Sequence, residues 1–162
     1  MNVFCFLVKR FKNLTVLLTA MNDLKKEKER LIEYWKKTRT IIDENVVRAF
    51  EKIPREEFML PQYKEYVYAD NAFPIHADQT ISQPTTVVVM LQALEIKKGM
   101  RVLEVGAGSG YNAALLQEIV GNSGRVVSTE VVQELAEFAK KNLKKVNSKA
   151  AFVHHEGRKG YA

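Results

Sequence analysis

The chain has 162 residues, of which 46% are hydrophobic, enough for one domain with a buried core. No apolar run reaches the ~20 residues that span a bilayer, and the single cysteine, Cys5, excludes an intrachain disulfide framework and suits a reducing, cytoplasmic compartment. The net charge of +6 is compatible with a nucleic-acid surface, but the lysines are spread along helical segments, which indicates solvated helix faces.

Residues 1–20 form an unusual N-terminal segment. Two apolar stretches, 3–8 and 14–20, flank three basic residues. A signal peptide would place its charges ahead of a longer apolar core. One interpretation is an amphipathic surface anchor. The interpretation we favour is an extension without an essential role, upstream of a natural start at Met21.

The sequence from Asn22 to Phe58 is strongly helical. Apolar residues with helical spacing lead to Trp35, with charges on the opposite face. Asp43 is the expected N-cap of a second helix that Pro54 ends. A short turn is predicted over 55–58.

Residues 68–84 are predicted to form a polar loop, and such loops often carry functional sites. Tyr63, Tyr66 and Tyr68 are expected to pack over the core. A helix over 85–94 follows the loop, with Val88, Met90, Leu91 and Leu94 as its apolar residues.

The stretch from Arg101 to Tyr111 joins a buried-strand pattern to a glycine-rich turn. Glycine lets a backbone turn sharply and approach a ligand closely. A helix over 112–120, a strand over 125–130, a helix over 131–143 and a strand over 150–154 are expected to follow. The sequence thus predicts an α/β fold. It has a helical cap that includes the polar loop over 21–98 and a β-α-β-α-β unit with right-handed crossovers over 99–162.

The charges around the turn indicate which nucleoside would bind. Glu130 lies about 20 residues beyond the turn, where α/β folds hydrogen-bond a ribose. Dinucleotide folds favour G-x-G-x-x-G, but Tyr111 occupies the third glycine position, which disfavours a Rossmann oxidoreductase. Glu104 would suit a cation such as S-adenosylmethionine better than a pyrophosphate. The alternative is a strand–turn–helix whose glycines serve geometry alone.

Three blocks of the sequence resemble the protein-L-isoaspartate O-methyltransferase family. They are Ile-Pro-Arg-Glu-Glu-Phe at 53–58, Gln-Thr-Ile-Ser-Gln-Pro at 79–84 and Val-Leu-Glu-Val-Gly-Ala-Gly-Ser-Gly-Tyr at 102–111. The segment 156–161 is similar to a fourth family block, and the resemblance runs from about residue 28 to the end. It implies a Rossmann-like methyltransferase fold. It also implies methyl transfer from S-adenosylmethionine to the free carboxylate of L-isoaspartyl residues in damaged proteins.

The resemblance also implies where the cofactor would bind. The glycines would border its methionine portion, Glu130 its ribose and Glu156 with Gly157 its adenine. Together with the charge argument for Glu104, the expected cofactor-binding residues are Thr80, Ile81, Glu104, Gly106, Gly108, Ser109, Gly110, Glu130, Val131, Glu156 and Gly157.

Ser82 matches the active-site serine of the family and is the expected catalytic residue. The substrate carboxylate is already ionised at pH 7, so the serine would orient it as a hydrogen-bond donor and no general base is needed. An alternative role is the N-cap of the helix that follows Pro84. The adjacent His154 and His155 have no metal-site spacing, so no metal is expected.

The chain departs from the family pattern in three places. His76 and Asp78 occupy a loop where family members usually have glycines, and His155-Glu156 replaces the usual Gly-Asp. Only three of about seven strands can be placed, so the resemblance implies a chain truncated at its C-terminus. The glycine-turn strand would then form an open edge, which invites pairing with a second copy. A non-catalytic remnant and an RNA methyltransferase are the alternative functions.

Overall fold

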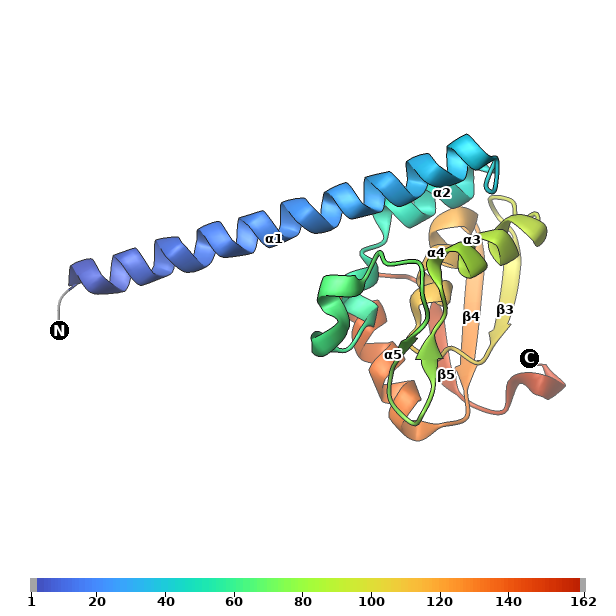
Figure 1. The fold of residues 1–162 in the computed structure, drawn as a ribbon. Helices are drawn as coiled ribbons and strands as arrows, with labels where there is room; N and C mark the ends of the chain where they lie inside the picture. Colours follow the sequence, from blue (N-terminus) through green and yellow to red (C-terminus); the bar gives the residue numbers. More distant parts are fainter. Residues whose placement is uncertain (1–2, 161–162) are drawn as a thin grey trace.

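The computed structural model describes the backbone of residues 3–160 and the side chains of residues 21–160. Helix α1 (Val3–Thr38) is continuous through Met21, and Figure 1 shows its N-terminal part projecting away from the rest of the fold. Its C-terminal part packs on the body through Leu31, Ile32 and the fully buried Trp35, as its apolar spacing predicts. The interpretation of residues 1–20 concerns side chains outside the described residues.

Two 3-10 helices follow α2 and bring the chain to the loop over 68–84. Helix α2 (Glu44–Lys52) begins at the predicted N-cap, where the Asp43 carboxylate accepts a hydrogen bond from the Asn45 amide at 2.8 Å. The predicted turn is η1 (Arg55–Phe58), and η2 (Pro61–Tyr66) leads into the loop. Tyr68 is buried as expected, but Tyr66 is 55% exposed, so the packing prediction was wrong for that side chain.

The segment expected to be an open loop contains a small hairpin. Strands β1 (Phe73–Pro74) and β2 (Thr80–Ile81) pair antiparallel. Helix α3 (Pro84–Ala93) follows directly. Its residues Met90 and Leu94 are each 61% exposed, because the helix packs through Val87, Val88 and Leu91 instead.

The predicted β-α-β-α-β unit is present with nearly the expected bounds. Strands β3 (Arg101–Val105), β4 (Arg125–Glu130) and β5 (Ala151–His154) form a parallel sheet in the order β3-β4-β5. Helices α4 (Tyr111–Val120) and α5 (Gln133–Lys145) connect them. Both connections run in the same direction along the sheet, and α4 and α5 contact each other on one of its faces, the arrangement that two crossovers of the same hand produce. A short η3 (Gly157–Lys159) follows β5.

One hydrophobic core unites the helical segments and the sheet. Helix α4 is buried between them and contributes Ala113, Leu115 and Leu116, while α2 contributes the fully buried Phe50. Trp35 meets the Phe50 ring edge-on, with 4.7 Å between ring centres. The helical cap therefore packs directly on α4, the helix that follows the glycine turn.

Strand β3 lies at one edge of the described sheet. Leu103 and Val105 alternate with Glu104 and are 42% and 53% exposed, on the face away from α4. Parallel strands normally have both faces covered. The outer face of β3 departs from this rule, because Leu103 and Val105 leave apolar surface exposed there. Among the described residues, no helix combines the length and apolarity that crossing a membrane requires.

Candidate functional site

The glycine turn after β3 is tied to the end of the neighbouring strand. Gly106, Gly108 and Gly110 have φ values of 89°, 54° and 85°, a left-handed region that favours glycine. The amides of Gly106 and Ala107 both donate to the Thr129 carbonyl at 2.9 Å. A Cβ on Gly106 would meet no protein atom within 4 Å. The backbone is therefore bare on this side, where a ligand can approach it.

The Glu130 carboxylate closes the turn from the end of β4. It accepts hydrogen bonds from the Gly108 amide at 3.0 Å, the Val131 amide at 2.8 Å and the Val132 amide at 3.1 Å. Glu130 is buried, with 6% of its surface exposed. A carboxylate has about four lone-pair positions, so one further donor, such as a hydroxyl, can still be accepted.

Glu104 lies in the middle of β3 with its carboxyl group directed toward α4. Asn112 Nδ2 donates to it at 2.7 Å, and the Ser128 hydroxyl donates to its other oxygen. Burial raises the pKa of Glu104 to about 7, although these two hydrogen bonds favour the charged form. A cation placed nearby would restore full ionisation.

The glycine turn and the segment before α3 line the same cavity. Its volume is about 280 Å³, and it lies between α3, β3 and the start of α4. The predicted site residues that line it are Thr80, Ile81, Ser82, Glu104, Gly106, Gly108 and Ser109. Residues separated by more than 20 positions in the sequence are thus brought together around one space.

The Ser82 side chain is exposed and does not cap α3. The cap comes instead from Asp70, whose carboxylate accepts from the Thr85 amide at 2.9 Å and the Thr85 hydroxyl at 2.6 Å. Gln83 Nε2 donates to the same carboxylate at 3.0 Å. The alternative role of Ser82 as an N-cap was therefore wrong, and its hydroxyl makes no hydrogen bond within the described residues.

The last predicted site residues lie at the end of β5, outside the lining of this cavity. Gly157 is buried against β3 and β4, where a Cβ would overlap the Thr129 hydroxyl. The Glu156 carboxylate binds the Arg158 guanidinium, with 2.8 Å between Oε2 and Nη2. Hydrogen bonds from Arg158 lower the pKa of Glu156 to about 2. Glu156 is therefore charged, and its carboxylate is held by Arg158, two residues along the chain.

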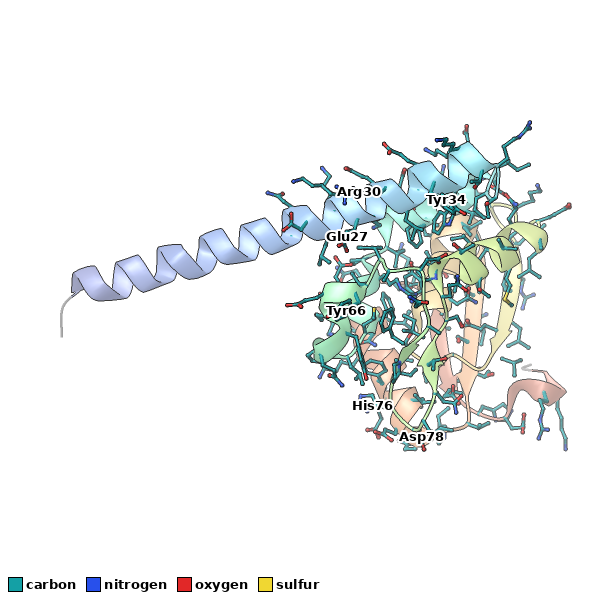
Figure 2. The ribbon with its side chains drawn as sticks, viewed as in Figure 1. Glu27, Arg30, Tyr34, Tyr66, His76 and Asp78 are labelled. Atoms are coloured by element: carbon teal, nitrogen blue, oxygen red, sulfur yellow. The ribbon has the colours of Figure 1, made fainter. Side chains whose placement is uncertain are left out.

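The loop that departs from the family pattern is held against α5. His76 Nδ1 lies 2.9 Å from Glu134 Oε1, and the His76 ring meets Phe138 edge-on at 4.8 Å. Figure 2 shows His76 and Asp78 at the tip of the hairpin. Ala77 and Asp78 have φ values of 53° and 54°, so the tip keeps a backbone that glycine would adopt without strain.

Sequence reasoning assigned no role to several residues that shape this site. Ser128 pairs with Glu104 in the parallel register, so aligning the two strands would have found it. Asn112 lies in the first turn of α4, two residues after Gly110. Asp70 and Arg55 carry no local signal, because their partners lie 12 to 27 positions away. In the part of the chain that the structure describes, no group of three or more His, Cys, Asp or Glu residues is arranged to hold a metal.

Comparison with known proteins identifies the family. The family model described as Protein-L-isoaspartate(D-aspartate) O-methyltransferase (PCMT) matches residues 26–162. The chain belongs to this family. A protein-L-isoaspartate O-methyltransferase of Thermococcus sibiricus is 44% identical over 142 residues, which are 86% of this chain and 63% of that protein. The corresponding protein of Pyrococcus horikoshii is 45% identical over 83% of this chain and 64% of its own length.

Solved structures of family members share the fold. A protein-L-isoaspartate O-methyltransferase superposes with a TM-score of 0.69 at 36% identity, over 80% of this chain and 42% of that chain. A second, from Plasmodium falciparum, was solved in complex with S-adenosyl-L-homocysteine. It gives a TM-score of 0.68 at 25% identity, over 78% of this chain and 62% of that chain. The chain spans less than two thirds of the length of these relatives.

Proposed function

We propose that this protein transfers a methyl group from S-adenosylmethionine to the free carboxylate of L-isoaspartyl residues in damaged proteins. Membership of the family supports this reaction. The observation that carries the proposal is the shared cavity, in which the Ser82 segment faces the glycine turn. Such an arrangement places a substrate-binding group opposite a nucleoside-binding turn.

The residues around the turn fit the proposed cofactor. The bare backbone at Gly106 leaves room for a close approach, and the Glu130 carboxylate can accept a ribose hydroxyl. Glu104 offers a carboxylate to the cationic methionine portion. When bound, the cofactor supplies a methyl group on a sulfonium, which is reactive without further activation. In this proposal Glu156 and Gly157 flank the adenine.

Ser82 is the proposed catalytic residue, because its exposed hydroxyl is free to donate to a ligand in the cavity. An isoaspartyl carboxylate is ionised at pH 7, so it needs orientation rather than deprotonation. Alignment of the reacting oxygen and methyl group can contribute about 7–11 kcal/mol to catalysis. Because the chain has a single cysteine, a reducing compartment such as the cytoplasm is the proposed location.

The reaction is tested by incubating the protein with labelled S-adenosylmethionine and an isoaspartyl peptide, beside the same peptide with normal aspartate. Base-labile label on the isoaspartyl peptide alone is the expected result. Label on RNA would instead support an RNA methyltransferase, and label on no substrate would support a non-catalytic remnant. Ser82→Ala should lower methyl transfer while cofactor affinity stays nearly unchanged; equal losses of both would contradict the role given to Ser82.

A further inference from the structure

Arg55 is a buried cation with no carboxylate among its hydrogen-bond partners in the described part of the chain. Its side chain has no solvent exposure. Its Nε donates to the Val67 carbonyl at 3.0 Å, and its Nη2 donates to the Ser82 carbonyl at 2.7 Å. Burial lowers the pKa of the guanidinium, but arginine stays protonated in proteins. Burying a charge is costly, so an apolar side chain would serve a purely packing role better.

The groups that Arg55 contacts come from separate parts of the site. Val67 ends η2, and Ser82 lies between β2 and α3. The guanidinium carbon also lies 5.1 Å from the ring centre of Tyr111, the residue that follows Gly110 and begins α4. A single side chain therefore connects the proposed catalytic segment to the exit of the glycine turn.

The chain at and after Ser82 is held in place, while the Ser82 hydroxyl is left free. Asp70 binds Gln83 through its Nε2 and Thr85 through its amide. Arg55 is the side chain that holds the peptide of Ser82 itself. If this bond were lost, the peptide plane after Ser82 would lose its direct restraint, and Ser82 would be held less firmly beside the cavity.

We propose that Arg55 is a positioning residue that fixes Ser82 relative to the glycine turn. Its role in the reaction rests on the proposed function, but its effect on the segment can be measured without catalysis. The planar guanidinium reaches two carbonyls with separate nitrogens, whereas a lysine ammonium offers a single point charge. Residues 80–83 should therefore be held most firmly with arginine at position 55, less firmly with lysine, and least firmly with an apolar side chain.

The test compares Arg55→Met and Arg55→Lys with the control Phe58→Leu. Phe58 lies on the same turn, is fully buried and packs its ring 5.3 Å from the Tyr111 ring centre. No hydrogen bond links it to Ser82. The control therefore removes packing from the same place without touching the Ser82 carbonyl. Thermal unfolding of all variants establishes how far each is destabilised.

Two readouts separate positioning from packing. In Arg55→Met, amide hydrogen exchange over residues 80–83 should accelerate by about 10-fold or more, the scale of one lost charge-assisted hydrogen bond. The kcat for an isoaspartyl peptide should fall by about 10- to 100-fold, as expected when a reacting group is misplaced by about 1 Å. Cofactor affinity should change little, and Arg55→Lys should be intermediate in both readouts.

Suppose that Phe58→Leu and Arg55→Met lose equal thermal stability and also show the same amide hydrogen exchange over 80–83 and the same kcat. Arg55 would then be a packing residue, and the proposal would be overturned. Unchanged exchange over 80–83 in both Arg55 variants would overturn it as well. If Arg55→Met does not fold, Arg55→Lys is compared with the control by the same readouts. A wild-type protein without methyl transfer, combined with the expected exchange pattern, would refute the proposed function and leave the positioning of Ser82 standing.

Discussion

The Glu130 carboxylate and the Gly108 amide are joined by a hydrogen bond of 3.0 Å, which ties the glycine turn to the end of β4. The other Glu130 oxygen accepts the two amides that follow. Glu130 therefore shapes the turn in addition to any contact with a ligand. A change at this position should disturb the turn even when no ligand is present.

Glu130→Gln should weaken binding of S-adenosylhomocysteine by about 10- to 100-fold. The new amide nitrogen cannot accept a backbone N–H, and a hydrogen bond to a charged group is worth about 1.5–3 kcal/mol. Isothermal titration calorimetry measures the affinity. Glu137→Gln, on the exposed side of α5, is the matched control and should bind normally. Normal affinity in Glu130→Gln would contradict the role of this carboxylate.

Ionisation of Glu104 should make cofactor binding depend on pH. Burial raises the pKa of Glu104 to about 7, so the carboxyl group is mostly neutral one pH unit lower and mostly charged one unit higher. The charged form attracts a cation, and affinity for S-adenosylmethionine should therefore rise by up to about 10-fold across this window. Calorimetry at several pH values measures it, and Glu104→Gln should show a flat profile.

The same group should affect the stability of the unliganded protein in the opposite direction. The folded-state pKa of about 7 lies above the ordinary value of 4.5, so the folded state binds the proton more tightly. The contribution of Glu104 to the unfolding free energy is therefore greatest below pH 4.5 and falls as pH rises toward 7. Denaturation of wild type and Glu104→Gln across this range isolates the effect, and parallel curves would refute it.

Asp70 should stabilise the fold more than Asp43, although both carboxylates cap helices. Asp70 accepts from three donors on Gln83 and Thr85, whereas Asp43 accepts from the Asn45 amide alone. We expect Asp70→Ala to lower the unfolding free energy by about 2–3 kcal/mol and Asp43→Ala by about 1 kcal/mol. Urea denaturation gives both values, and the reverse order would contradict the assignment.

Ala77→Gly should stabilise the protein, because Ala77 is exposed and has a φ of 53°. The left-handed conformation costs alanine about 1–2 kcal/mol, while glycine loses about 0.4–1 kcal/mol through greater freedom in the unfolded chain. The expected net gain is about 0.5–1 kcal/mol in urea denaturation. Ala93→Gly, within α3, is the control and should destabilise instead.

The exposed edge at β3 should promote self-association. Leu103 and Val105 present apolar side chains on the open face beside this edge, and unpaired strand edges pair readily with another copy. Leu103→Lys should shift the protein toward monomer in light scattering coupled to size-exclusion chromatography. Leu94 at the end of α3 is also exposed, so Leu94→Lys tests whether replacing an apolar surface residue elsewhere shifts the protein toward monomer in the same way. A strictly monomeric wild type would refute the prediction.

The sequence was sufficient for features that depend on neighbours along the chain. The Asp43 cap acts within two residues, and the strand–turn–helix from Arg101 to Val120 follows from apolar periodicity and the conformational freedom of Gly106, Gly108 and Gly110. Local sterics and local hydrogen bonds decide such elements, so the pattern of residue types determines them.

Only the tertiary structure decided what holds the segment around Ser82 in place. The sequence left the N-cap of the helix as an alternative role for Ser82, but Asp70 caps α3 from 15 positions earlier, and Arg55 reaches the Ser82 carbonyl across 27 positions. Met90 and Leu94 fit an apolar pattern and yet are exposed. Contacts between distant segments depend on how the whole chain packs, and the two carbonyls that accept hydrogen bonds from Arg55 reach it only because folding brings them there.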